Sequence, residues 1–300
     1  MFFLLFFLAL FWPILPHAYE YPLSPKSVPA ADLARFESWV QYAAAAYCVD
    51  NVKAKEGAKL SCPPKNCPYV QQADTSVILS FTTPVTDTAG FVAADHTHRA
   101  IVIAFRGTVS IRSIVFDWDP VLTKTNLCPG CMAEKGFWYS WIAVRSEILE
   151  TVGKAIIEYP DYQIISVGHS LGGSIATLAA ASLRAHGHHV ILYSYGSARV
   201  GNRALSANLT AQAGNYRLTH TVDPIPKLPP LLMGYVHISP EYWITAPSSS
   251  KVQPDQINVL TGLVNWHGNT GTGPPLLGDL PAHLWYFQSV SLCAEPMPFQ

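Results

Sequence analysis

The sequence predicts a single α/β domain in which a mostly parallel sheet is covered by helices on both faces. Short apolar runs rich in β-branched residues alternate with longer amphipathic segments, the pattern of parallel strands joined by helices. With 300 residues, 49% of them hydrophobic, the chain can bury one large core. No repeat, heptad or low-complexity segment interrupts the pattern, so we expect no internal domain boundary.

A first helix is expected over 32–47, capped by Asp32 and packed through residues such as Leu33, Phe36 and Val40. Two further helices are expected over 137–159, ended by Pro160, and over 173–184, ended before Gly187. Apolar and β-branched composition predicts strands over 76–81, 89–94, 99–105, 162–167, 190–195 and 217–222.

The chain begins with a continuous apolar run over residues 1–12, broken by Pro13 and Pro16. This run is too short to span a bilayer comfortably and indicates a secretory signal over 1–18, cleaved near Ala18. No lysine or arginine precedes it, so a membrane-retained anchor is the alternative. Residues 19–30 are expected to form a linker or pro-segment, and 31–300 the folded domain. The sequon at Asn208 predicts a glycosylation site and is compatible with secretion.

Charge is sparse and balanced. The net charge is −1 and charged residues make up 13% of the chain. Without a basic patch or an acidic tail, we expect neither nucleic acid nor an obligate protein partner. A low charged fraction suits a protein that works beside lipid, and it equally suits an ordinary large core.

The cysteines are even in number, which fits an oxidising compartment. They are Cys48, Cys62, Cys67, Cys128, Cys131 and Cys293. Cys128 and Cys131 form a C-x-x-C, but a zinc site would need a second such pair or two histidines at ligand spacing, so no metal is expected. Local disulfides 62–67 and 128–131 are favoured, which would leave 48–293, although six cysteines allow about fifteen arrangements.

The most informative motif is Gly168-His169-Ser170-Leu171-Gly172, which lies between a predicted strand and a predicted helix. A serine on so sharp a turn needs a strained backbone, and glycines two residues away on either side remove the collisions that side chains would make. The helix start directs N–H groups and a positive dipole end at the reacting oxygen. We therefore predict that Ser170 is a hydrolase nucleophile, the alternative being a Gly-rich turn with an incidental serine.

A serine nucleophile needs an orienting acid and a base, which in hydrolases on such sheets follow in that order. The acids after Ser170 are Asp223, Glu241, Asp255, Asp279 and Glu295. Asp223 directly follows a predicted strand, at the carboxyl end where such sheets build their active sites. The alternative is that an Asp before a proline only forms a turn.

The histidines after Asp223 are the candidate bases. His283 lies in a short polar-to-aromatic turn, His267 in a Gly/Asn-rich stretch typical of a mobile loop, and His237 where packing explains it equally well. His169 is next to the nucleophile, but adjacent side chains on a tight turn diverge. We therefore favour His283.

Two N–H donors are needed where negative charge develops on the substrate. One is expected from Leu171, the residue after the nucleophile. The other is expected from Thr108, in the Phe105-Arg106-Gly107-Thr108 turn that ends an early strand. The alternative there is a plain β-turn with a capping threonine.

Residues 109–119 follow that turn and carry an apolar stripe with helical spacing. Its members are Ile111, Ile114, Val115 and Trp118, with Phe116 beside them. Such a stripe is usually a core helix. Because this one is brief, is flanked by polar residues and follows the expected oxyanion loop, we predict a short helical lid that offers its apolar face to lipid when open.

Together these motifs resemble the secreted class 3 lipases of filamentous fungi, the relatives of the Thermomyces and Rhizomucor lipases and of the fungal feruloyl esterases. The likeness runs from about Asp32 to Cys293. Besides the serine motif it rests on the segments 105–108, 195–202, 223–230, 234–237, 241–244 and the one that holds His283.

The resemblance implies an α/β-hydrolase fold with Ser170 as nucleophile, Asp223 as acid and His283 as base. It also implies an oxyanion hole of Thr108 and Leu171, and disulfides 48–293, 62–67 and 128–131. The chain departs from the family in three places. Thr108 stands where the best-known lipases have serine, Ala198 stands where proline is usual, and the lid matches no relative closely.

The expected activity is hydrolysis of acylglycerols, triacylglycerols first, at a lipid–water interface through an acyl-enzyme and without metal or cofactor. The alternatives within enzymes are a phospholipase A1, a mono- or diacylglycerol lipase and a feruloyl esterase. A non-catalytic lipid-binding protein on the same fold is the alternative from another class.

Overall fold

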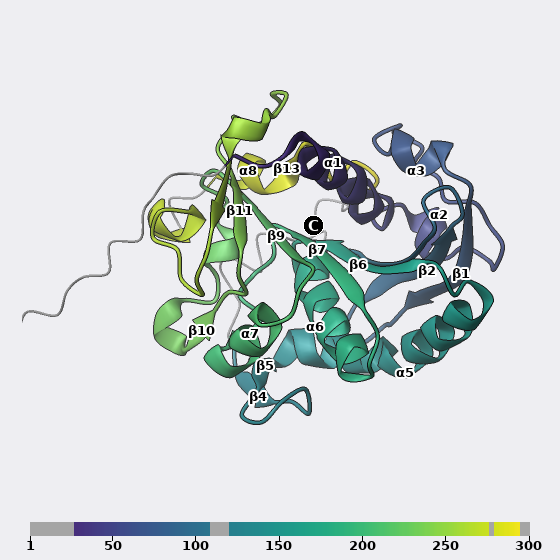
Figure 1. The fold of residues 1–300 in the computed structure, drawn as a ribbon, viewed down its shortest axis with the longest axis horizontal. Coiled ribbons are helices and arrows are strands. Elements are labelled where there is room, and N and C mark those ends of the chain that lie inside the picture. The colour runs from purple at the N-terminus through teal and green to yellow at the C-terminus, as the bar shows by residue number, and fades with distance from the viewer. Residues whose placement is uncertain (1–26, 109–119, 276–278, 295–300) are drawn as a thin grey trace, which may run out of the picture.

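The computed structural model describes residues 27–108, 120–275 and 279–294 (Figure 1). Its centre is an eight-stranded sheet in the order β1-β2-β3-β6-β7-β9-β11-β12. The strands β3, β6, β7, β9 and β11 are parallel, and antiparallel strands flank them on both sides. The expected mostly parallel sheet is confirmed. The strands are β1 (Thr75–Thr82), β2 (Ala89–Asp95), β3 (Ala100–Phe105), β6 (Gln163–His169), β7 (Val190–Tyr195), β9 (Asn215–His220), β11 (Glu241–Ile244) and β12 (Ile257–Leu260).

Helices cover both faces of this sheet. Figure 1 shows α1 (Ala30–Ala45) above it, with α5 (Lys135–Glu158) and α6 (Leu171–Ala185) below. Strand β3 explains the two layers, because side chains alternate along a strand. Val102 and Ala104 pack with Phe36 of α1, while Ile101 and Ile103 belong to the cluster of α5 and α6.

Smaller elements complete the described part of the chain. The short helices are α2 (Val49–Val52), α3 (Pro68–Gln72), α7 (Arg203–Thr210) and α8 (Leu280–Leu284), with 3-10 turns η1 (Ile225–Lys227), η2 (Leu231–Met233), η3 (Pro254–Gln256) and η4 (Asn269–Gly271). A second sheet has the order β10-β8-β5-β4, from β10 (Tyr235–Val236), β8 (Gly201–Asn202), β5 (Met132–Glu134) and β4 (Leu122–Lys124). A third pairs β13 (Trp285–Tyr286) with β14 (Gln288–Ser289).

The start of the folded domain differs from the expectation. Asp32 does not cap the first helix: α1 begins at Ala30 after Pro29, and Asp32 forms an ion pair with Arg35 inside the first turn. Val28 is buried in the core and donates its N–H to Pro254 across 3.2 Å. The folded domain therefore begins before residue 31, because Val28 of the expected linker is buried in the core.

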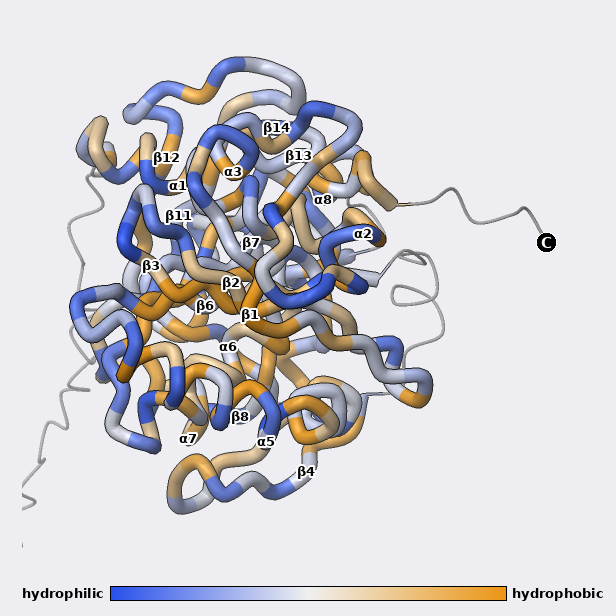
Figure 2. The backbone as a smooth tube through the Cα atoms, turned by 90° about the vertical axis from the view of Figure 1, so that its right-hand side faces the viewer, coloured by the Kyte–Doolittle hydropathy of each residue, from blue (hydrophilic) through white to orange (hydrophobic). Residues whose placement is uncertain are grey.

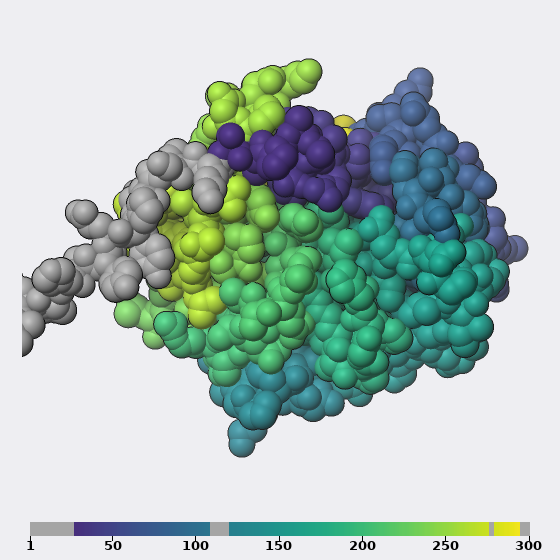
Figure 3. All heavy atoms as spheres, in the orientation of Figure 1, coloured from purple at the N-terminus to yellow at the C-terminus, as the bar shows by residue number. Residues whose placement is uncertain are grey.

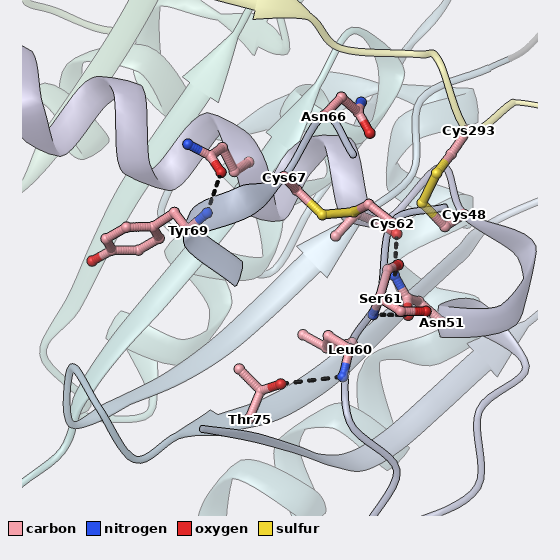
Figure 4. The surroundings of a disulfide bond; sticks show 12 residues. Cys48, Asn51, Leu60, Ser61, Cys62, Asn66, Cys67, Tyr69, Thr75 and Cys293 are labelled. Atoms are coloured by element: carbon pink, nitrogen blue, oxygen red, sulfur yellow. Dashed lines mark hydrogen bonds between the residues drawn. A yellow bond between two sulfur atoms is a disulfide. The ribbon is translucent and has the colours of Figure 1, made fainter. Parts of the chain in front are cut away.

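The cysteines pair as 48–293, 62–67 and 128–131, with Cα–Cα distances of 4.6, 5.9 and 5.2 Å. Figure 4 shows the first two side by side, and the sulfurs of Cys48, Cys62 and Cys293 lie within 4.8 Å of one another. The 48–293 disulfide joins the segment after α1 to the far end of the described chain. It therefore constrains residues 245 positions apart in sequence.

The hydropathy pattern matches the layered core. In Figure 2 the most hydrophobic stretches follow the central strands, and the outer loops are largely hydrophilic. In Figure 3 the side chains of α1 (purple) pack directly on the green central segments. Within the described ranges, no helix has both the length and the apolar character needed to cross a membrane. Residues 1–18 and the predicted lid, 109–119, lie outside these ranges.

Candidate active site

Ser170 lies at the junction of β6 and α6, on the strained turn that the sequence predicts. Its φ of 57° is in a region that side chains rarely adopt, and its side chain is fully buried. The neighbouring glycines are required by space. A Cβ on Gly168 would lie 2.3 Å from the carbonyl carbon of Gly172, and a Cβ on Gly172 would lie 2.2 Å from the Phe105 oxygen. The two glycines therefore leave the space that the strained backbone of Ser170 needs.

The structure brings Ser170, His283 and Asp223 together. His283 Nε2 lies 2.9 Å from Ser170 Oγ. On the other side of the ring, His283 Nδ1 lies 2.9 Å from Asp223 Oδ2 and 3.0 Å from Oδ1. The carboxylate only accepts, so Nδ1 carries the proton and Nε2 is free to accept from the serine. This is the geometry of a nucleophile with its base and orienting acid.

The Asp223 carboxylate has two further donors. The N–H of Ile225 donates to Oδ1 across 2.9 Å, and the hydroxyl of Tyr286 donates to Oδ2 across 2.6 Å. Burial, and next the charge of Asp223, hold the pKa of Tyr286 well above its usual value, so this hydroxyl keeps its proton. Sequence reasoning missed Tyr286, whose one local signal is that it follows His283 by three residues.

A buried polar cluster supports the backbone of Asp223. The side-chain amide of Asn269 donates to the carbonyls of Asp223 and Thr221, across 2.9 and 3.2 Å. The Asn269 N–H in turn donates to Glu241, which forms an ion pair of 3.3 Å with Arg217. Glu241, one of the acids weighed for the triad, thus lies behind the site rather than in it. Burial lowers the pKa of Arg217.

The expected oxyanion residues lie at the same edge of the sheet. Phe105 ends β3 and pairs with Gly168 of the parallel strand β6, so the turn that holds Thr108 leaves the sheet beside the serine turn. Leu171 is the first residue of α6, and the first N–H groups of a helix have no partner within it. The residues after Thr108, including the lid side chains, lie outside the described ranges.

The other candidate bases take different positions. His237 is buried, and its Nε2 lies 2.6 Å from the carbonyl oxygen of Pro226. Burial, followed by the charges of Arg217 and Arg199, holds the pKa of His237 well below its usual value. His267 is exposed. Asn208, the predicted glycosylation residue, is exposed on α7.

The chain matches two family models, "Lipase (class 3)" over residues 102–233 and "Lipase 3 N-terminal region" over residues 2–79. It is 49% identical to the secreted mono- and diacylglycerol lipase A of Penicillium cyclopium, over 93% of this chain and 92% of the relative. A solved mono- and diacylglycerol lipase from Aspergillus oryzae superimposes with a TM-score of 0.86 at 52% identity, covering 88% of this chain and 100% of that one.

A more distant solved structure is a triacylglycerol lipase described as having a serine protease triad at its catalytic centre. Its TM-score is 0.79 at 27% identity, covering 89% of this chain and 99% of that one. The motifs, the fold and these matches agree, and the chain belongs to the secreted fungal class 3 lipases.

Proposed function

We propose that this lipase cleaves acylglycerol esters through an acyl-enzyme, with Ser170 as nucleophile, His283 as base and Asp223 as orienting acid. The observation that carries the proposal is the continuous set of short contacts from Ser170 through His283 to Asp223, in which all three side chains are buried. No cofactor is needed for this chemistry.

In this mechanism His283 takes the proton of Ser170 as the oxygen attacks the ester carbonyl, and Asp223 stabilises the imidazolium that forms. The N–H of Leu171, with Thr108, stabilises the oxyanion. His283 returns the proton to the leaving glycerol oxygen, and the acyl group stays on Ser170. Water that is activated by His283 then releases the fatty acid.

Triacylglycerols and partial glycerides are the two candidate substrates. The relatives at 49% and 52% identity are named mono- and diacylglycerol lipases, which favours partial glycerides, while the structure at 27% identity is a triacylglycerol lipase. The apolar side chains of 109–119 support a lid that engages the lipid–water interface. Rates on emulsions of triolein, diolein and monoolein, with phosphatidylcholine and methyl ferulate beside them, rank the substrate classes.

The nucleophile is tested by Ser170→Ala on a soluble p-nitrophenyl ester. We expect kcat to fall by at least about 10³-fold. The matched control is Ser174→Ala, one turn along α6, because Ser174 is buried and its hydroxyl has no hydrogen-bond partner among the described residues. Unchanged hydrolysis by Ser170→Ala would contradict the proposal.

The lid prediction is tested with tributyrin. A hydrolysis rate that does not rise when tributyrin passes its solubility limit would contradict a lid that opens at the lipid–water interface.

We also propose that residues 1–18 are removed on secretion, that a linker or pro-segment follows them, and that Asn208 carries a glycan. The buried Val28 supports a mature chain that keeps the residues just before α1. N-terminal sequencing of the secreted protein tests the first two points, and mass spectrometry tests the glycan.

A further inference from the structure

Helix α8, which contains His283, is too short for most of its backbone carbonyls to accept hydrogen bonds from within the helix. Helix α8 has five residues, and the last four carbonyls of any helix have no partner within it. Two of these carbonyls meet buried histidines. Nδ1 of His220 lies 2.8 Å from the oxygen of Ala282, and Nε2 of His169 lies 2.8 Å from the oxygen of His283. These two histidines end β9 and β6, the strands that lead to Asp223 and Ser170.

The hydrogen bonds of His169 define its protonation. A carbonyl oxygen only accepts, so Nε2 carries the proton, and in the neutral ring Nδ1 is the acceptor. The hydroxyl of Tyr47 lies 2.8 Å from that Nδ1. Burial, and then the nearby His283, hold the pKa of His169 well below its usual value, and burial raises the pKa of Tyr47. His169 is therefore neutral while Tyr47 keeps its proton.

Tyr47 connects this histidine to the expected oxyanion loop. The Tyr47 hydroxyl lies against Gly107, the residue before Thr108. A Cβ on Gly107 would lie 2.0 Å from that oxygen, so this contact requires glycine. Two hydrogen bonds thus run from Tyr47 through His169 to the backbone of His283, and Tyr47 packs against Gly107 of the expected oxyanion loop.

The rings of His169 and His283 also lie against each other, with centroids 4.6 Å apart and planes at 32°. His220, at the end of β9, lies between two backbone carbonyls, because its Nε2 is also 2.9 Å from the oxygen of Ala246. A neutral ring has one N–H and donates to only one of these two oxygens. His283 is thus contacted at Nδ1 by Asp223, along its ring by His169, and at its own carbonyl by His169 Nε2.

We propose that His169, with Tyr47 behind it, is a positioning residue that holds His283 in line with Ser170 and couples the base to the oxyanion loop. The proposal rests on the proposed function, since it assigns what holds the base of that triad. A displacement of about 1 Å in a reacting group costs about 100-fold in rate, so we expect the fixed His283 carbonyl to affect kcat rather than substrate binding.

The test compares three variants on a soluble p-nitrophenyl ester. His169→Phe keeps an aromatic ring but loses both hydrogen bonds, and we expect kcat to fall by about 100-fold with KM within about threefold. His169→Gln keeps an N–H near the position of Nε2 and should recover about tenfold of that loss. Tyr47→Phe should lower kcat by about threefold to tenfold, less than His169→Phe, because His169 keeps its bond to His283.

Tyr42→Phe is the matched control. Tyr42 lies in α1, five residues before Tyr47, and also loses a buried hydroxyl bond, that to Asp95 at 2.6 Å. It should keep the wild-type kcat. Circular dichroism reports the fold of each variant, and if His169→Phe does not fold, His169→Gln and Tyr47→Phe are compared with Tyr42→Phe.

Wild-type kcat in a folded His169→Phe, or in Tyr47→Phe if only that variant folds, would overturn the proposal. So would equal loss in His169→Phe and His169→Gln, because restoring the N–H would then restore no activity and the hydrogen bond to His283 would not be the cause. Ser170→Ala is measured beside them. If it stays active, the triad itself is wrong, whereas loss in Ser170→Ala with none in the His169 variants rejects the positioning role alone.

Discussion

Two buried aspartates of this lipase have almost the same partners, and only one belongs to the proposed triad. Asp95 accepts from the hydroxyl of Tyr42 at 2.6 Å, from Nδ1 of His98 at 2.6 Å and from the N–H of His98 at 3.0 Å. Asp223 likewise accepts from a tyrosine hydroxyl, a histidine Nδ1 and a backbone N–H, at 2.6, 2.9 and 2.9 Å.

The two sets differ in where they lie. Asp95 pairs with Ala100, the first residue of β3, whereas Asp223 follows the carboxyl end of β9. The other side of the His283 ring faces Ser170, while the ring of His98 stacks on Tyr69 with centroids 4.3 Å apart. A histidine, an aspartate and a tyrosine in contact therefore do not make an active site by themselves. They also need a strained nucleophile and free helix N–H groups, which lie at the carboxyl edge of the sheet.

The largest expected difference in kcat is between variants of Asp223 and Asp95. We expect Asp223→Asn to lower kcat by about 10³ to 10⁴-fold, because an amide facing His283 favours the wrong tautomer. Asp95→Asn should leave kcat within about threefold and lower the free energy of unfolding by about 1–3 kcal/mol, since a buried donor then faces donors. Kinetics on a soluble ester and urea unfolding measure both. A catalytic loss in Asp95→Asn would break the comparison.

We expect a smaller difference in kcat between variants of Tyr286 and Tyr42, the tyrosines that donate to the two carboxylates. Tyr286→Phe removes one donor from the Asp223 carboxylate, and we expect kcat to fall by about tenfold, which corresponds to about 1.4 kcal/mol. Tyr42→Phe should cost about 1–2 kcal/mol of stability with no change in kcat. Both variants are assayed side by side, and equal kcat values would show that Tyr286 only packs.

The smallest effect concerns pH, because a neutral histidine lies beside the Asp223 set. The pKa of His169 is well below its usual value through burial and His283, so below about pH 6.5 the unfolded chain binds a proton that the folded chain does not. Stability is therefore lost as pH falls below about 6.5, by about 1.4 kcal/mol per pH unit for this residue.

His169→Gln should remove that contribution to the slope, and Tyr42→Phe should shift the curve without changing its slope. Urea unfolding between pH 5 and 7 measures this, and parallel curves for wild type and His169→Gln would contradict it.

Most of what could be predicted about the site came from short stretches of the sequence. A strand, two glycines around a serine and a helix lie within about twenty residues, so their geometry follows from chain stereochemistry. Asp223 was predicted as the acid because it follows a strand. Helix starts were less predictable: Asp32 has a capping composition, yet α1 begins two residues earlier, after Pro29.

The residues that contact the site from elsewhere in the chain had no such local signal in the sequence. Tyr47 meets His169 across 122 positions, His220 meets Ala282 across 62, and Tyr286 meets Asp223 across 63. Each is one of many buried aromatic or histidine residues in the sequence. Sheet register and strand order bring them together, and neither can be read from a short window.

The sequence alone thus predicted the turn at Ser170, the proposed order of acid and base, and the α/β class, because these depend on neighbouring residues and hydrophobic periodicity. The fold in three dimensions distinguished Asp223 from Asp95 as the aspartate whose histidine faces a serine, and it placed His169 and His220 on the carbonyls of α8. That distinction arises because parallel strands end at one edge of the sheet, where distant loops converge on Ser170.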